Sequence, residues 1–327
     1  MQNGLMGNGV GGVAVVGAGA VGLSVAVVLA EAGHAVTVIA DAPGPQDCSP
    51  AAGAVWFPYG VTLDQSLIDA SEISRLRFEG LADIEGTGVV RRRGTYIARR
   101  ADADLGWADA LPGKRDLAVS ELPEGATAGF RVTVPVIDMS RYLPWLRASA
   151  EASGVRFEQR RLTTLDEIGG FDATVVAAGL SSGELVHDDE PSIPRRGQVV
   201  RVKNPGLTDW VIDENAPAGM TYVIPRIDEI VLGGTDDADD ARTEPDPVIE
   251  AGILERASAL VPEMTGLPIV SRAVGFRPGR STPRIGWIDP ARGLLACYGH
   301  GGAGVTLSWG SAQAVAKLLH TADGRVS

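Results

Sequence analysis

A glycine-rich loop near the amino terminus constrains the fold of this chain more than any other feature. The loop Gly17–Gly22 has the sequence Gly-Ala-Gly-Ala-Val-Gly and follows a short apolar run, Val13–Val16. An Ala-, Val- and Leu-rich segment continues to about Ala32, a second apolar run follows at Ala35–Ile39, and Asp41 comes just after it. A strand, a glycine turn, a helix and a strand within about 30 residues predict a βαβ unit with parallel strands.

The order of these elements is typical of a dinucleotide-binding site. Gly17 is expected to make the tight turn, Gly19 to let the backbone approach a pyrophosphate, and Gly22 to pack the helix against the strand. The helix N-terminus supplies N–H donors and partial positive charge, and Asp41 is placed to accept from ribose hydroxyls. A glycine turn without a ligand is the alternative, and this loop does not separate NAD from FAD.

A second glycine cluster, near the other end of the chain, favours FAD. Gly299–Gly304 lies between a predicted strand at Gly293–Tyr298 and a predicted helix that extends to about Leu319. This helix offers a second N-terminus to a distant part of an extended cofactor, and the N1–C2=O edge of a flavin is its expected target. A simple packing turn is the alternative.

The rest of the chain predicts two interleaved groups of elements. Strands are expected at 94–98, 131–134, 155–159, 173–177 and 197–202 with several more up to 235, and helices at 64–81, 140–153 and 245–261. The βαβ pieces alternate with a middle region made of strands. This predicts an α/β domain joined to an α+β domain, each built from discontinuous segments.

Bulk properties argue against several functions. The net charge of −12 disfavours a nucleic-acid partner, because phosphate binding needs Lys and Arg. No apolar run is long enough to span a bilayer, and residues 1–12 lack the basic and apolar regions of a secretory signal. Cys48 and Cys297 fit a reducing compartment without a disulfide, and residues 323–327 are no peroxisomal address. We therefore expect a cytoplasmic protein with no membrane or nucleic-acid partner.

Several separated motifs add a family resemblance. They are Ala51–Tyr59, Gly197–Val202, Thr221–Pro225, Leu232–Thr235, Gly275–Pro278 and Tyr298–Gly304. The motifs and their order resemble those of the D-amino-acid oxidase family, and the resemblance extends from Val13 to about Leu319. The resemblance implies non-covalent FAD, no metal, and a Rossmann-like FAD-binding domain at 1–53, 139–185 and 268–327. It also implies a substrate-binding domain with a discontinuous, largely antiparallel β-sheet at 54–138 and 186–267.

The same resemblance implies roles for individual residues. Arg277 is expected to pair with the substrate α-carboxylate, Tyr222 to hydrogen-bond the same group, and the Gly302 carbonyl to accept from the substrate amine. A guanidinium suits its role because it presents parallel N–H donors and a permanent charge. A surface arginine and a core tyrosine are the alternatives. The side-chain pocket is expected to be lined by Phe57, Tyr59 and Ile224. The expected FAD contacts are Gly17, Gly19, Ala20, Gly22, Asp41, Ser49, Ala52, Gly53, Ala178, Gly302, Gly304, Val305 and Thr306.

Four residues depart from the family pattern or invite another interpretation. Ala42 stands where a basic residue usually follows the acidic one, and Ala218 where mammalian members carry a second active-site tyrosine. The ribose contact and the side-chain specificity are therefore open. We interpret His300 as a packing residue rather than a general base. Cys297 lies beside the second loop, as the cysteine of a covalent flavin link would, but the surrounding motif resembles that of the non-covalent family.

The implied reaction is the oxidative deamination of a neutral D-amino acid. Hydride transfer from Cα to flavin N5 gives an imino acid that hydrolyses to a 2-oxo acid and ammonia, and oxygen reoxidises the flavin to yield hydrogen peroxide. The expected partners are thus a D-amino acid and molecular oxygen, and the resemblance is compatible with a homodimer. The alternatives are a glycine or sarcosine oxidase-like enzyme, a quinone-linked flavin amine dehydrogenase, and a flavin-binding protein without turnover.

Overall fold

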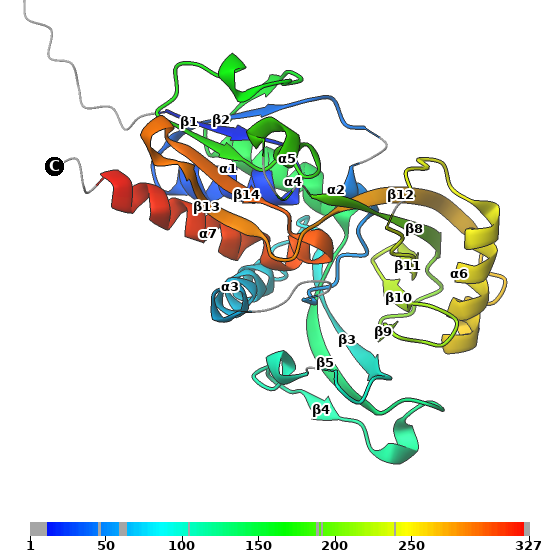
Figure 1. Cartoon of the computed structure of the whole chain (residues 1–327). Helices are drawn as coiled ribbons and strands as arrows, with labels where there is room; N and C mark the ends of the chain where they lie inside the picture. Colours follow the sequence, from blue (N-terminus) through cyan, green and yellow to red (C-terminus); the bar gives the residue numbers. More distant parts are fainter. Residues whose placement is uncertain are drawn as a thin grey trace, which may run out of the picture.

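Two β-sheets lie side by side in the computed structural model of this chain (Figure 1). The structure describes residues 12–44, 47–58, 64–103, 105–187, 190, 192–238 and 240–323. One sheet holds the first two strands and the last two, and the other holds most of the strands between them.

The first sheet has six strands and a parallel core. Its order is β13 (Arg284–Asp289), β14 (Leu294–Tyr298), β7 (Ala173–Val176), β1 (Gly12–Val16), β2 (Ala35–Ala40) and β6 (Arg156–Gln159). The strands from β14 to β6 are parallel, and β13 pairs antiparallel with β14 at the edge. The predicted βαβ start and the return strands are confirmed, whereas β13 was not predicted.

Helices cover both faces of this sheet. Val13 and Val15 of β1 pack in one core with α1 (Ala20–Glu31) and α7 (Gly304–Asp323), whereas Val16 packs toward α5 (Ser181–Val186). This division follows from the two-residue repeat of a strand, which sends alternate side chains to opposite faces. Gly33, with a φ of 92°, follows the last turn of α1 and confirms the predicted helix end.

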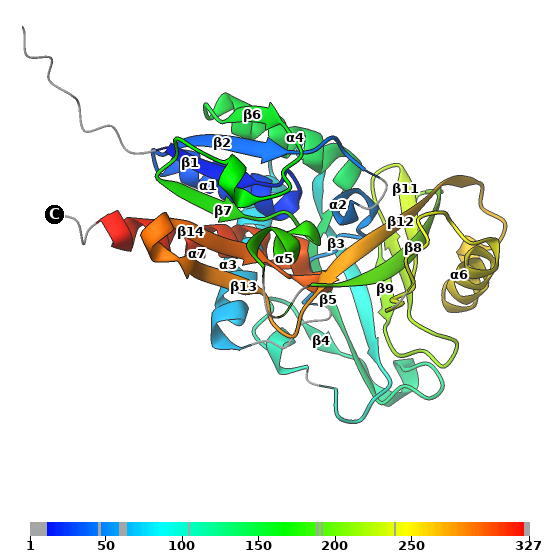
Figure 2. The ribbon, with the colours of Figure 1, turned by 45° about the horizontal axis from the view of Figure 1, so that its top comes forward.

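The second sheet has eight strands and is largely antiparallel, as predicted. Its order is β12 (Ile269–Gly279), β8 (Ile193–Lys203), β11 (Glu229–Gly233), β10 (Thr221–Pro225), β9 (Trp210–Asp213), β3 (Val89–Ala98), β5 (Ala128–Ile137) and β4 (Arg115–Asp116). Only the β3–β9 pair is parallel among the pairs of this described sheet. Its outer face is covered by α6 (Pro247–Leu260), whose Ile253 and Ala257 are fully buried against Val200 and Val223. Figure 2 places α6 at the end of the molecule opposite the first sheet.

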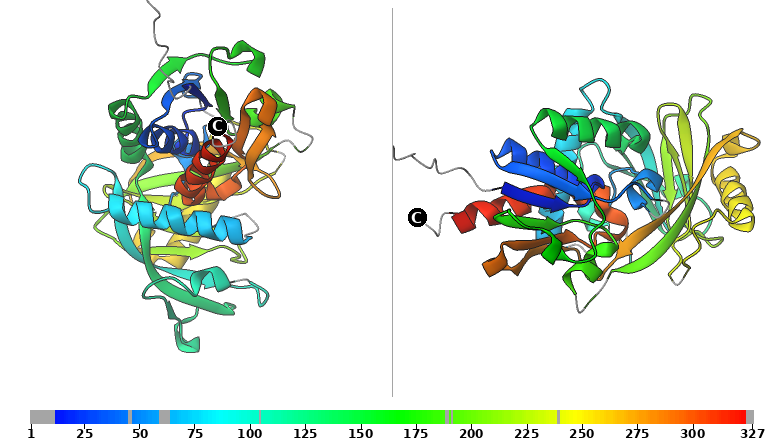
Figure 3. Two further views of the ribbon diagram at one scale, coloured as in Figure 1. Left: turned by 90° about the vertical axis from the view of Figure 1, so that its left-hand side faces the viewer. Right: turned by 90° about the horizontal axis from the view of Figure 1, so that it is seen from above.

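Three further helices connect the sheets. They are α2 (Cys48–Ala51), α3 (Gln65–Leu81) and α4 (Met139–Ala152). α3 lies against α7 (Figure 3), where the Gly310 N–H donates to Ser74 Oγ at 2.9 Å. A Cβ on Gly310 would come within 2.1 Å of the Ala70 carbonyl oxygen, so this approach requires glycine.

Packing differs from the expected domain boundaries in two places. β12 falls inside the segment 268–327, yet it pairs with β8 of the second sheet along nearly its whole length. α3 falls inside 54–138, yet it packs on α7, which covers the first sheet. Both differences arise from contacts between segments far apart in sequence. We therefore propose the same two domains, with β12 assigned to the substrate-binding domain and α3 to the cofactor-binding domain.

Candidate active site

The first glycine loop has the geometry of a nucleotide-binding turn. Gly17 has a φ of 111°, and a Cβ there would lie 2.4 Å from the Ala177 carbonyl oxygen. A Cβ on Gly22 would lie 2.1 Å from the Gly17 carbonyl oxygen, so this glycine lets α1 pack against the loop. Gly19 differs, because a Cβ there would meet only Ser49 Oγ, at 3.2 Å. Gly17 and Gly22 thus serve packing, and Gly19 leaves space at the helix N-terminus.

The predicted polar partners lie around this turn. Ser49 of α2 brings its Oγ to the N-terminus of α1, where it accepts from the Ala20 N–H at 3.1 Å. Asp41 is exposed just after β2, and its Oδ1 accepts from the Ala42 N–H at 2.7 Å. Ala178 lies two residues after the end of β7, the neighbour of β1. These residues gather at the carboxyl ends of adjacent parallel strands, where open α/β sheets bind ligands.

A cavity between the two sheets collects most of the other predicted residues. Of the predicted positions, its lining includes Ala52, Gly53, Phe57, Tyr222, Ile224, Arg277, Gly302, Val305 and Thr306. Substrate-side and cofactor-side positions from distant parts of the chain therefore meet in one space. Tyr59 lies outside the described residues.

Arg277 is held in a fixed orientation within this cavity. It lies on β12 opposite Arg195 of β8, and its Nη1 donates to the Thr235 carbonyl at 3.0 Å. Asp236 Oδ1 lies 3.5 Å from the same nitrogen. The guanidinium packs over Gly197, where a Cβ would come within 2.6 Å of Nη1. Its side chain is 15% exposed, so the arginine is mostly buried but still accessible to a ligand in the cavity.

Tyr222 lies on β10 and is packed on glycine. A Cβ on Gly233 would lie 2.2 Å from its Cζ, and a Cβ on Gly234 2.8 Å from its hydroxyl oxygen. Burial raises the pKa of Tyr222, and the charge of Arg277 opposes that shift only in part. The phenol therefore stays protonated at neutral pH and can donate a hydrogen bond to a ligand near Arg277.

The second glycine cluster forms a 3₁₀ turn, Gly301–Ala303, that leads directly into α7. Thr306 in the first turn of α7 joins this end of the helix to the pocket wall. Its Oγ1 donates to the Phe57 carbonyl at 2.7 Å and accepts from the Phe57 N–H at 3.1 Å. A helix N-terminus and a pocket side chain are thereby fixed relative to each other.

His300 and the two cysteines agree with the roles expected of them. His300 is buried, its Nε2 lies 3.0 Å from Ser311 Oγ, and burial lowers its pKa to about 4. A neutral histidine bonded to a buried serine is a packing residue. Both cysteines are free, so no disulfide forms, and burial raises the pKa of Cys297 to about 12. Cys48 lines the cavity, and burial also raises its pKa.

Sequence reasoning missed one charged residue of the cavity. Glu214 lines it together with Ile212, which lies two positions earlier on β9. The available signal was its position directly after Asp213, the last residue of β9. That signal has meaning only once β9 is known to lie between β10 and β3.

Known proteins resemble this chain in sequence and in fold. Residues 12–318 match the family model described as FAD dependent oxidoreductase. The chain is 40% identical to a D-amino-acid oxidase of Rubrobacter xylanophilus, covering 98% of this chain and 99% of that protein. It is 41% identical to a D-amino-acid oxidase of Streptomyces coelicolor, covering 94% and 96%. Among solved structures, the glycine oxidase of Geobacillus kaustophilus superposes with a TM-score of 0.79 at 19% identity, covering 95% of each chain. Among the helices described, none is both long and apolar enough to cross a membrane.

Proposed function

Because the chain belongs to the family of FAD-dependent oxidoreductases that includes D-amino-acid oxidases, we propose that it oxidises free D-amino acids. We propose further that oxygen is the electron acceptor, and that neutral side chains are preferred to acidic ones. The family assigns FAD as the cofactor and an amino acid as the substrate class.

One observation carries this proposal. Arg277 and Tyr222 line the same cavity as Gly302 and Thr306, although the first two lie on strands of the second sheet and the other two lie at the N-terminal end of α7. A substrate whose α-carboxylate is bound by Arg277 and Tyr222 would extend toward the N-terminus of α7. That position suits the flavin end of FAD, because a helix N-terminus stabilises negative charge on a reduced flavin.

The FAD-binding positions fit the cofactor as a set. The space beside Gly19 and the N-terminus of α1 suit the pyrophosphate, and Asp41 suits the adenosine ribose. Ala52, Gly53 and the turn before α7 line the cavity where the ring system would lie. Small residues predominate, so contacts would come mainly from the backbone.

The residues of this chain would act by orientation rather than by acid or base catalysis. Arg277 would fix the carboxylate through two N–H donors, Tyr222 would donate its hydroxyl, and the Gly302 carbonyl would accept from the amine. Bound FAD supplies the chemistry, accepting a hydride from Cα and passing electrons to oxygen as hydrogen peroxide.

The test is anaerobic reduction of the purified yellow protein by single amino acids, followed by peroxide assays in air. Bleaching of the flavin by D-alanine, D-valine or D-methionine but not by the L-forms is expected. Faster reaction with glycine or sarcosine would favour the glycine oxidase-like alternative. Reduction without peroxide would point to a quinone acceptor, and absence of any bleaching would refute oxidation of amino acids.

A further inference from the structure

The cavity contains a carboxylate that the proposed reaction does not use. Glu214 is partly buried, and its Oε2 accepts from the Tyr96 hydroxyl at 2.9 Å. Among the described residues, no lysine or arginine forms an ion pair with it. The preceding residue differs, because Asp213 pairs with Arg99 at 2.7 Å. Glu214 therefore lacks the partner that its neighbour has.

This carboxylate directly follows β9, whereas the expected carboxylate-binding arginine lies on another strand of the same sheet. On β9, Ile212 is paired with Tyr222 of β10 on one side and with Tyr96 of β3 on the other. The ring of Tyr96 lies against Phe57, with centroids 5.1 Å apart. Tyr96 thus holds Glu214 toward the side-chain pocket. Arg277 lies at the far edge of the same sheet, on β12.

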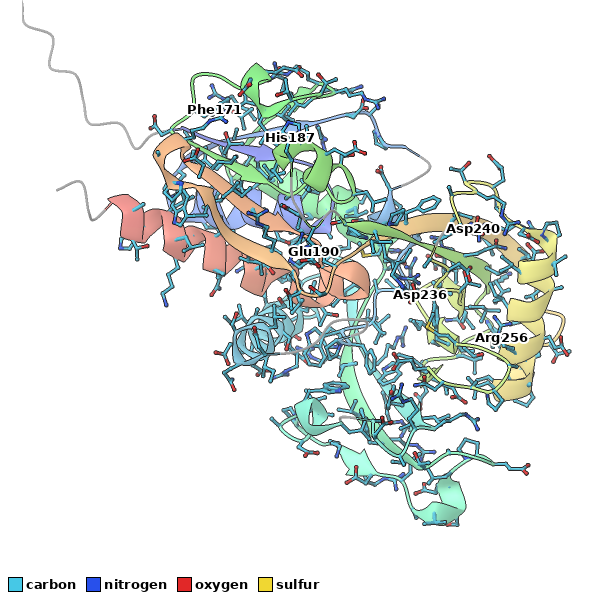
Figure 4. All side chains as sticks on the ribbon, in the orientation of Figure 1. Phe171, His187, Glu190, Asp236, Asp240 and Arg256 are labelled. Carbon is cyan, nitrogen blue, oxygen red and sulfur yellow. The ribbon has the colours of Figure 1, made fainter. Side chains whose placement is uncertain are left out.

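The surroundings of Glu214 make an unpaired carboxylate costly. The wall around it is apolar and includes Phe57, Ile212, Met220 and Ile224. Burial raises the pKa of Glu214, Asp236 raises it further, and the Tyr96 hydroxyl opposes both. A carboxylate in such a place is stabilised by a cation that brings its own hydrogen-bond donors. Asp236 cannot supply this positive charge, since it is itself acidic and pairs with Arg195. Figure 4 shows Asp236 on the half of the molecule that holds the second sheet.

We propose that Glu214 determines side-chain specificity by accepting hydrogen bonds from the terminal ammonium or guanidinium group of a long cationic D-amino acid, such as D-lysine or D-arginine. Arg277 would hold the α-carboxylate of the same molecule. This inference rests on the proposed oxidation of D-amino acids and refines it. Substrates with cationic side chains are then oxidised with a higher kcat/KM than neutral substrates of equal length, and the Glu214 carboxylate repels acidic side chains.

The test compares substrates that differ only at the end of the side chain. D-Lysine and D-norleucine share a four-carbon chain, and Nε-acetyl-D-lysine keeps the length of lysine but removes its charge. For the wild-type enzyme, kcat/KM is expected to be higher for D-lysine than for the other two. Glu214→Gln keeps an acceptor for Tyr96 and removes the charge. It should lower the ratio of D-lysine to D-norleucine efficiency by on the order of tenfold to a hundredfold.

A matched control is Glu151→Gln, which makes the same substitution at an exposed position of α4 that pairs with Arg147. The ratio of D-lysine to D-norleucine efficiency in Glu151→Gln should equal that of the wild type. If the ratio is the same in Glu214→Gln and the wild type, or if wild-type enzyme prefers D-norleucine to D-lysine, Glu214 does not select cations. Loss of activity toward both substrates in equal proportion would mean that Glu214 only packs. If the wild type oxidises no D-amino acid at all, the proposed function fails first and this inference fails with it.

Discussion

Replacement of Arg277 makes the strongest demand on the proposed function. Its guanidinium is already fixed in the structure, by the Thr235 carbonyl at 3.0 Å and by contact with Gly197. Little conformational entropy is lost when such a group binds a carboxylate, so most of the interaction is available for binding. Arg277→Ala removes a charge-assisted pair from a largely desolvated site, at a cost of about 3–5 kcal/mol. The value of kcat/KM for D-alanine should fall by at least about two orders of magnitude.

Related substitutions separate charge from geometry. Arg277→Lys keeps the positive charge but loses the paired donors, so its efficiency should lie between those of the wild type and Arg277→Ala. Amines without a carboxylate should lose little in either variant. Arg272→Ala is the matched control, because Arg272 lies on the same strand but is half-exposed and bonded to Glu250. That control should retain wild-type kinetics.

The measurement is steady-state oxidation of D-alanine, with flavin content determined on the same samples. Flavin content should be normal in all variants, because the predicted pyrophosphate contacts are on the first sheet whereas Arg277 is on the second. An Arg277→Ala enzyme with full activity would refute the reasoning. So would one whose defect is explained entirely by loss of FAD.

Three further predictions follow from the cavity and the first loop. Gly19→Val should abolish FAD retention, and the protein should still fold because only Ser49 Oγ lies near the added Cβ. Gly22→Ala should instead cost about 1–3 kcal/mol of stability, because its Cβ would meet the Gly17 carbonyl oxygen. Thermal unfolding and flavin content, measured on the same samples, distinguish the two variants. D-Aspartate should be oxidised more slowly than D-alanine, since the arginine expected at the substrate is used on the α-carboxylate; the opposite order in a peroxide assay would contradict this. Burial raises the pKa of Glu214, so its carboxylate is lost as pH falls through that raised value. The ratio of D-lysine to D-norleucine efficiency should therefore rise with pH as Glu214 ionises, and a flat profile would argue against the assignment.

Local patterns in the sequence were sufficient to predict the first βαβ unit and its glycine turn. The strand, the glycine turn and the helix of the first βαβ unit are adjacent in the chain, and each is specified by its own residues. Gly17 and Gly22 each make close contacts with backbone from the same unit or from Ala177, where the chain returns to it. The short distance along the sequence is the reason that the loop could be interpreted without a structure.

The rest of the fold depends on how strands pair, which local patterns do not specify. β13 was missed because its residues are all partly exposed and show no alternation, and its pairing with β14 specifies it. β12 was grouped with the cofactor-binding segments because only its pairing with β8 reveals the sheet to which it belongs. Glu214 escaped notice for a related reason: the cavity that it lines is assembled from several strands, among them β8, β9, β10 and β12.

The double hydrogen bond between Thr306 and Phe57 has a consequence for redesign of the pocket. Both bonds use main-chain atoms of residue 57, so any residue other than proline, which lacks the N–H, can make them. A library that varies residue 57 can therefore reshape the wall without breaking its link to α7. Thr306 has no such freedom, because the hydroxyl that serves as both donor and acceptor belongs to its side chain. Diversity for new substrates belongs at position 57, and position 306 is best kept constant.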